Sequence, residues 1–281
     1  MQYIAPLTSR SLLRLEGSDA DSFLQNLITC DVENLAEGAA RFGALLTPQG
    51  KILFDFIIMR ECDGFILDIE TEQRDALMKR LTFYKLRADV QISVDDRPVF
   101  ASWFDATAQP QSSPPGFADP RHAKLGWRHY GDVPGSNSDE TAWHKNRIKL
   151  GIPQSGSDFE LGSLFPHDAL MDQLQDGGID FSKGCYVGQE VVSRMQHRGT
   201  ARNRFVMVEA SHPFPPGATG SSLTADGKRV GTMGSSVETT GLALVRVDKI
   251  ATAMAAGHPI KSDEAEIQLT IPDFANFGWS P

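Results

Sequence analysis

Three apolar runs with turn residues between them constrain the fold of the first part of the chain. Residues 41–46 and 52–59 are rich in strand-forming residues and are joined by Thr47-Pro48-Gln49-Gly50. A third run, residues 65–69, follows the turn Cys62-Asp63-Gly64. Because each connection is only a few residues long, neighbouring runs are expected to pair in opposite directions. The pattern therefore predicts a meander of antiparallel strands.

Helical patterns flank this meander. Residues 11–15 alternate like a strand, Gly17 interrupts them, and the residues that follow have the spacing of a short helix. Residues 71–86 predict a second, amphipathic helix, with Leu77, Leu81 and Tyr84 on its buried side. Helices combined with antiparallel strands indicate an α+β domain. The last strands of this domain are predicted at residues 90–94 and 99–103.

The composition changes twice further along the chain. Residues 106–120 are polar and proline-rich, which is typical of a surface loop. A strand is predicted at residues 127–130 and a helix at 141–150. Toward the end, short alternating runs separated by glycines indicate an antiparallel β-barrel. We therefore predict one region over residues 1–200, containing two interleaved α+β subdomains, and a barrel over residues 201–281.

Charge and composition exclude several classes of protein. A formal net charge of -9 over 281 residues disfavours direct nucleic-acid binding, which depends on neutralising phosphates. No apolar run approaches the roughly 18 residues that a membrane span needs. The N-terminus lacks the pattern of a secretory signal, and three widely spaced cysteines suit a reducing compartment. We therefore expect a protein in the cytoplasm. We expect no permanently bound metal, because the histidines lack metal-ligand spacing. We also expect a monomer.

The octet Lys183-Gly184-Cys185-Tyr186-Val187-Gly188-Gln189-Glu190 carries the most chemistry. The spacing of residues 187–196 suits a short helix, which would place Cys185 at or just before a helix N-terminus, with Lys183 close by. Both surroundings favour a thiolate. A lone cysteine can equally be a small buried hydrophobe, and local chemistry leaves both interpretations open.

A basic cluster follows the octet. Its members either form a solvated helix end and strand start or bind an anionic ligand tail. A hydrolase that pairs Cys185 with His197 or His167 is a further alternative, but no third group is evident that would orient the base. The cluster consists of Arg194, His197, Arg198, Arg202 and Arg204.

The octet resembles the signature of the YgfZ family, the folate-binding relatives of the glycine-cleavage T-protein. Residues 17–25, 46–51 and 150–153 follow the order of the same family, so the resemblance covers nearly the whole chain. It implies an α+β fold of the T-protein type. In this fold two ferredoxin-like α+β domains surround a central channel, and an antiparallel β-barrel follows them.

The resemblance also implies a function. It suggests a protein that binds tetrahydrofolate, or a derivative, and assists iron-sulfur cluster assembly or repair in transiently bound client enzymes, including tRNA-modifying enzymes. Cys185 would be the essential thiolate. Trp143 stands where the family places a folate-contacting tryptophan, while a second one would fall near Arg10, whose guanidinium can also stack on a ring. The expected folate contacts are Trp143, Lys183, Gly184, Tyr186, Gly188, Gln189, Glu190, Arg194, Arg198, Asp55 and Arg10.

A folate-dependent aminomethyltransferase is the enzymatic alternative. The T-protein has two adjacent aspartates on the strand after the turn at Gly50, where this chain has Phe54 and Asp55. Loss of one carboxylate weakens the case for aminomethyl transfer, which needs a carboxylate near the reacting amine. Asp55 remains a candidate pterin ligand. We therefore expect an accessory maturation factor rather than a classical enzyme.

Overall fold

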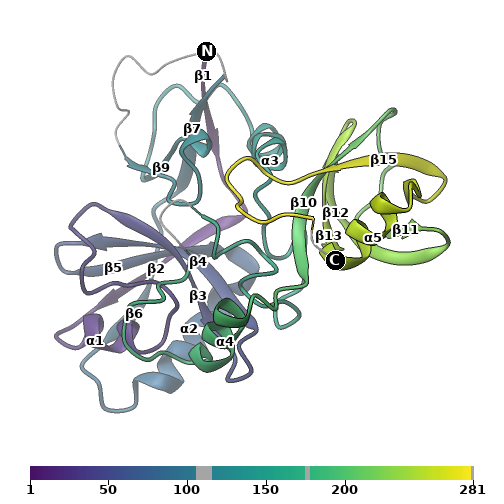
Figure 1. Ribbon diagram of the computed structural model, residues 1–281. Helices are drawn as coiled ribbons and strands as arrows, with labels where there is room; N and C mark the ends of the chain where they lie inside the picture. Colours follow the sequence, from purple (N-terminus) through teal and green to yellow (C-terminus); the bar gives the residue numbers. More distant parts are fainter. Residues whose placement is uncertain (106–115, 175–177, 280–281) are drawn as a thin grey trace. The chain divides into compact units, whose positions relative to one another are not determined.

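The computed structural model describes residues 1–105, 116–174 and 178–279 (Figure 1). Contacts group the chain into two compact units. The first unit comprises Met1–His144 and Leu174–Gln189, and the second comprises Lys145–Gln173 and Glu190–Pro281. The predicted regions, residues 1–200 and 201–281, divide the chain differently.

A five-stranded antiparallel sheet forms one part of the first unit, in the order β3-β4-β5-β2-β6. The predicted meander is confirmed, since β3, β4 and β5 are consecutive neighbours. Helix α2 packs against β2, β5 and β6, and α1 contacts β5. The elements are β2 (Arg10–Glu16), α1 (Ala20–Gln25), β3 (Ala40–Leu46), β4 (Ile52–Glu61), β5 (Gly64–Glu70), α2 (Thr71–Lys85) and β6 (Gln91–Asp95).

Burial explains why these elements form. Leu77 and Leu81 of α2 are fully buried, as the helical spacing predicts, while Tyr84 is only partly buried. Strands β4 and β5 are buried along most of their length, which agrees with their nearly continuous apolar sequence. Such strands remove apolar area from water on both faces and contribute much of the folding free energy.

A second, four-stranded sheet completes the first unit, in the order β1-β7-β9-β8. Strands β6 and β7 were predicted to close one unit, and both lie in the first unit, but in different sheets, because β7 pairs with β1 and β9. The alternating apolar pattern of such a strand is the same in either sheet. Only its pairing partners decide which sheet it joins. The elements are β1 (Gln2–Pro6), β7 (Val99–Phe104), β8 (Phe117–Ala118), the 3₁₀ turn η1 (Ala123–Leu125), β9 (Trp127–Tyr130) and α3 (Glu140–Lys149).

The predicted loop at residues 106–120 is corrected at its end. Residues 106–115 lie outside the described part of the chain, whereas Phe117 and Ala118 form strand β8. The two residues pair with Arg128 and Trp127 of β9. A strand this short carries too little periodic signal to be found beside a proline-rich stretch.

The predicted barrel is confirmed in the second unit, where six strands close in the order β10-β13-β12-β11-β14-β15 (Figure 1). Ile250 and Ala253 of α5 join the apolar side chains of the strands in one core. Strand β11 and helix α5 were not predicted. The elements are α4 (Gln189–Arg198), β10 (Asn203–Ala210), β11 (Ser222–Ala225), β12 (Lys228–Val237), β13 (Thr240–Arg246), α5 (Val247–Ala255), β14 (Ile260–Ser262) and β15 (Ala265–Thr270).

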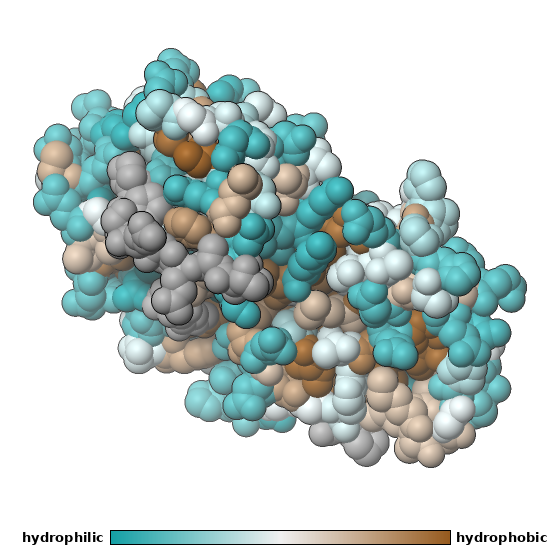
Figure 2. Space-filling view, turned by 90° about the horizontal axis from the view of Figure 1, so that it is seen from above, coloured by the Kyte–Doolittle hydropathy of each residue, from teal (hydrophilic) through white to brown (hydrophobic). Residues whose placement is uncertain are grey.

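Figure 2 shows one face of the molecule coloured by hydropathy. In the view of Figure 2, hydrophilic side chains cover most of the visible face, with apolar residues in smaller groups between them. Within residues 1–105, 116–174 and 178–279, no helix has both the length and the apolar character for a membrane span.

Candidate functional site

The signature octet packs against the turn between β3 and β4. Gly188 has φ 82°, and a Cβ at this position would lie 2.6 Å from the carbonyl oxygen of Thr47. Only glycine fits this conformation and this close approach without strain. A Cβ added to Gly184, by contrast, would meet no atom within 4 Å. The structure therefore explains one of the two glycines, and it brings the octet to the 46–51 segment.

Lys183 ties the octet to the segment after α1. Its Nζ donates to the carbonyl oxygens of Ile28 at 2.8 Å and of Cys30 at 2.7 Å. Burial lowers the pKa of this ammonium, although nearby anionic groups oppose the shift. The two hydrogen bonds give Lys183 a structural role. Its expected effect on the Cys185 thiolate stays a prediction.

Tyr186 is the buried member of the octet, with 6% of its surface exposed. Its ring lies below the ammonium of Lys183, with Nζ 5.4 Å from the ring centroid. Burial raises the pKa of the phenol, which therefore stays protonated. Its hydroxyl has no hydrogen-bond partner among the described residues. Buried polar groups are nearly always paired, so this hydroxyl retains capacity to bond a ligand or a water molecule.

Cys185 is exposed, so its interpretation as a small buried hydrophobe is wrong. Helix α4 begins at Gln189, and the predicted place of Cys185 at the helix N-terminus is also corrected, because the thiol precedes the helix by four residues. The field of a helix end falls off within about one turn, so Cys185 lies at the edge of the range of α4. Cys30, in contrast, is buried, and its burial raises the pKa of its thiol to about 12.

Trp143 and Arg10, the two predicted stacking residues, meet in one buried ion network. The Arg128 guanidinium carbon lies 4.8 Å from the centroid of the Trp143 ring. Arg128 donates to Asp68 at 3.2 Å, and Arg10 donates to the other oxygen of Asp68 at 2.6 Å. Arg128 also donates to Asp119 at 3.1 Å. The network thus links residues from β2, β5, β9 and α3.

This network does not fit a pterin stacked on either residue. Trp143 is 1% exposed, and guanidinium groups of Arg128 and Arg121 lie over its ring. Arg10 is committed to Asp68 and Glu70. The folate contacts expected in the octet, among them the exposed Gly184, stay a prediction. Asp55 is 7% exposed on β4, opposite Ala44 of β3.

Sequence reasoning missed four charged members of the network. Burial alone would raise the pKa of Asp119. The neighbouring guanidinium groups of Arg121 and Arg128 oppose this effect and hold that pKa well below its ordinary range. A signal was present: Asp68 interrupts the apolar run of residues 65–69, and a charge inside a buried strand requires a partner. The four residues are Asp68, Asp119, Arg121 and Arg128.

The predicted folate contacts on α4 lie at the surface of the second unit. Glu190 and Arg194 form an ion pair at 2.5 Å, with their side chains 83% and 56% exposed. Arg198 is also exposed. Exposed pairs of this kind contribute little to stability, typically about 0.3–0.5 kcal/mol.

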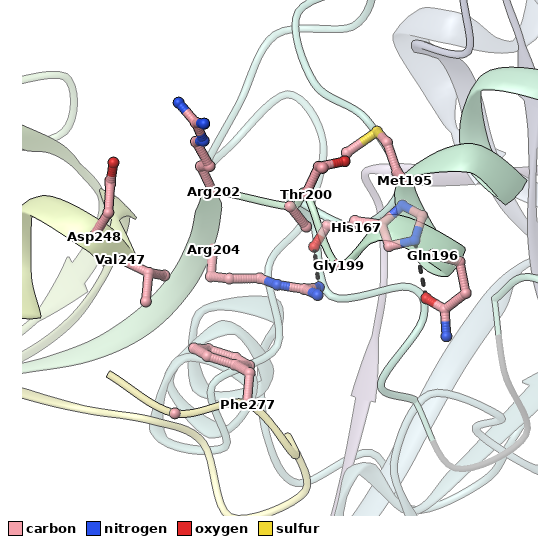
Figure 3. Close-up of a pocket in the computed structure, with 12 residues that line it drawn as sticks. His167, Met195, Gln196, Gly199, Thr200, Arg202, Arg204, Val247, Asp248 and Phe277 are labelled. Atoms are coloured by element: carbon pink, nitrogen blue, oxygen red, sulfur yellow. Dashed lines mark hydrogen bonds between the residues drawn. The ribbon is translucent and has the colours of Figure 1, made fainter. Parts of the chain in front are cut away.

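The basic cluster reaches a cavity of about 530 Å³ in the second unit (Figure 3). Arg202 and Arg204 line it, whereas Arg194 and Arg198 do not. Nη1 of Arg204 donates to the carbonyl oxygen of His167 at 2.7 Å and to Asp172 at 2.6 Å. The His167 ring hydrogen-bonds Gln196 at 3.2 Å, and burial lowers the pKa of this imidazole. His167 is therefore neutral near pH 7.

Comparison with known proteins assigns the chain to a family. The model of the GCVT N-terminal domain matches residues 7–99, and that of the CAF17 C-terminal beta-barrel domain matches residues 202–277. The human mitochondrial iron-sulfur cluster assembly factor IBA57 is 30% identical, over 95% of this chain and 84% of the relative. The chain belongs to the IBA57 family. The mouse IBA57 protein matches with the same identity and coverage.

A solved structure supports the fold of this IBA57-family chain. The glycine cleavage system aminomethyltransferase T from Bartonella henselae superimposes with a TM-score of 0.75, at 16% identity, over 98% of this chain and 86% of that chain. The predicted fold of α+β domains with a C-terminal antiparallel barrel is confirmed.

The relatives also correct one prediction. The IBA57 proteins of human, mouse and Neurospora crassa are all named as mitochondrial. These names point to a mitochondrial location, so the prediction of a cytoplasmic protein is wrong. The predicted family is confirmed at a coarser level, because the matches name IBA57 and CAF17.

Proposed function

We propose that this IBA57-family protein assists the assembly or repair of iron-sulfur clusters in client enzymes, including tRNA-modifying enzymes, and that YgfZ proteins are its bacterial counterparts. The observation that carries the proposal is the exposure of Cys185 on an octet anchored by Lys183 and Gly188. An exposed thiol on a fixed loop can meet a client protein. It would act as a redox-active group or as a transient iron ligand.

Tetrahydrofolate, or a derivative, is the proposed ligand of the first unit. Asp55 and the unsatisfied hydroxyl of Tyr186 would bond its polar edge, and the backbone near Gly184 and the side chain of Gln189 would line its approach. Gln189 donates weakly to the Gly184 carbonyl, at 3.4 Å, so this contact is easily exchanged for a ligand. Trp143 and Arg10 would support this site from the buried network, without direct stacking.

The partners would be transient clients, and the cluster would be cargo. Within the described residues, no group of three or more His, Cys, Asp or Glu side chains is arranged to hold a metal ion. A single thiol needs ligands from a second molecule to hold a cluster. We propose that the chain itself works as a monomer, without direct contact to nucleic acid.

The test is complementation in cells that lack the protein. The activity of a cluster-dependent tRNA-modifying enzyme is measured with the wild type, with Cys185→Ala and with Cys62→Ala. Cys62 is the matched control, because it is also exposed but lies between β4 and β5. We expect the wild type and Cys62→Ala to restore activity and Cys185→Ala to fail at equal protein level. Full activity with Cys185→Ala would refute the role of the thiol.

Aminomethyl transfer is the second candidate, favoured by the similarity to aminomethyltransferase T. The buried Phe54 beside Asp55 opposes it, since the site then has one carboxylate fewer. Incubation with an aminomethylated lipoyl donor and tetrahydrofolate decides between the two. Turnover that is abolished by Asp55→Asn would establish transfer, and absence of turnover would favour the maturation role.

A further inference from the structure

The cavity shown in Figure 3 contains hydrogen-bond donors that the protein leaves unused. The side chain of Arg204 is 10% exposed, and only its Nη1 donates to protein atoms. Its Nε and Nη2 have no acceptor among the described residues. Arg204 therefore presents the N–H groups of Nε and Nη2 to the cavity.

Two more donors belong to the same wall. Arg202 lines the cavity as an exposed side chain that makes no hydrogen bond to a described residue, and in Figure 3 it points away from Arg204. The hydroxyl of Thr200 is likewise unbonded within the described part of the chain and lies on the opposite side of Arg204 from Asp248 in Figure 3. Acceptor groups at the cavity are already taken, since Arg246 holds both oxygens of Asp248 at 2.9 and 2.6 Å.

The local charge is positive, although the chain as a whole is acidic. Asp172 pairs with Arg204, and Asp248 pairs with Arg246 and also interacts electrostatically with Arg202, so three arginines face two carboxylates here. Burial keeps His167 neutral near pH 7 by lowering its pKa. An anion is therefore favoured at this wall.

The remaining wall is apolar. The Phe277 ring lies 5.3 Å from the guanidinium carbon of Arg204, and Met195 and Val247 also line the cavity. A volume of about 530 Å³ is within the range of small-molecule sites. The cavity thus combines an apolar surface with the free N–H groups of Arg204.

We infer that this cavity binds an organic oxyanion, a carboxylate or a phosphate ester on an apolar body. The oxyanion accepts hydrogen bonds from Nε and Nη2 of Arg204, from Arg202 and from Thr200. Its apolar body packs on Phe277 and Met195. The site belongs entirely to the second unit, so it does not depend on the proposed folate ligand or on Cys185.

Calorimetric titration of the full chain at low ionic strength tests the site with three probes: phenyl phosphate, benzoate and inorganic phosphate. We expect saturable binding of an aromatic probe, tighter than that of inorganic phosphate, which lacks the apolar body. Tighter binding of phenyl phosphate than of benzoate would identify the ligand of this cavity as a phosphate ester, and the reverse order would identify it as a carboxylate. Failure of all three probes to saturate would overturn the inference.

Two charge-matched variants separate the site from general electrostatics. Arg202→Gln should weaken the preferred probe about tenfold or more, as expected for loss of a charge-assisted hydrogen bond. Lys145→Gln removes the same charge from the same unit. Lys145 pairs with Glu238, just before the start of β13, so its loss should leave the affinity for the probe unchanged. Equal affinities of these two variants would contradict a specific site. Phe277→Leu should remove most of the preference for an aromatic probe over inorganic phosphate.

Discussion

Gly188 lies against Thr47, so closely that a Cβ on the glycine would be 2.6 Å from the threonine carbonyl oxygen. This contact joins the octet to a tight turn closed by hydrogen bonds between Thr47 and Lys51 and between Gly50 and Thr47, each 2.8 Å long. The exposed thiol therefore sits on a loop with one end fixed at this turn and the other at Lys183. Such a loop positions Cys185 without burying it.

Gly188→Ala is expected to destabilise the protein by about 1–3 kcal/mol, because the added methyl group meets backbone atoms and φ is positive. Chemical denaturation measures the change in the free energy of unfolding. Gly184→Ala is the control within the same octet, and it should change stability much less, since open space surrounds that position. Equal effects of the two substitutions would contradict the close packing of Gly188 on the turn.

Thiol labelling should distinguish the three cysteines. Cys62 and Cys185 are exposed, whereas Cys30 is buried with its pKa raised to about 12. We expect a disulfide reagent at pH 8 to modify two thiols quickly in the native protein and the third only after unfolding. In the Cys185→Ala variant, the number of quickly modified thiols should fall from two to one. Fast labelling of Cys30 in the folded protein would show that the segment after α1 opens readily.

Arg128→Met should lower the free energy of unfolding by about 3 kcal/mol or more, because it leaves Asp68 and Asp119 with one cation fewer in a buried site. Arg194→Met removes an exposed pair and serves as the control, with an expected loss below about 1 kcal/mol. Denaturant titration of both variants checks the difference. A stable Arg128→Met protein would mean that Arg10 and Arg121 alone neutralise the two carboxylates.

His167 should make stability dependent on pH. Burial lowers its pKa below the ordinary 6.5, so as the pH falls the unfolded chain takes up this proton before the folded chain does. The free energy of unfolding therefore decreases from pH 6.5 down through the folded-state pKa, by at most about 1.4 kcal/mol per pH unit. His167→Gln should flatten this slope relative to the wild type. His258→Gln, at an exposed histidine, should not.

The sequence predicted the elements better than their partners. Alternation and turn residues located β3, β4, β5 and the barrel, because periodicity is a local property. It did not show that β6 and β7 lie in different sheets, since the pairing of β7 with β1 joins residues about a hundred positions apart. Strand β8 and helix α5 were missed, the first for its two-residue length.

The candidate site shows the same limit. The octet was recognisable as a motif, but its anchors, Thr47 and the carbonyl of Cys30, lie far away along the chain. The local pattern also placed the start of α4 two residues early, which moved Cys185 too close to a helix end. The partners of Arg10 and Trp143 come from separate strands, so the sequence showed a lone arginine and tryptophan where the fold forms a charge network.

The chain enters the first unit, leaves it after His144, returns for Leu174–Gln189 and leaves again. On the ribosome, the turn at Thr47 emerges well before Gly188, so its surface stays uncovered until most of the intervening segment has been synthesised. Translation speed through that segment sets how long the incomplete unit is open to chaperones or to premature association. Synonymous codon changes between residues 145 and 173 could therefore alter the yield of folded protein without changing one amino acid.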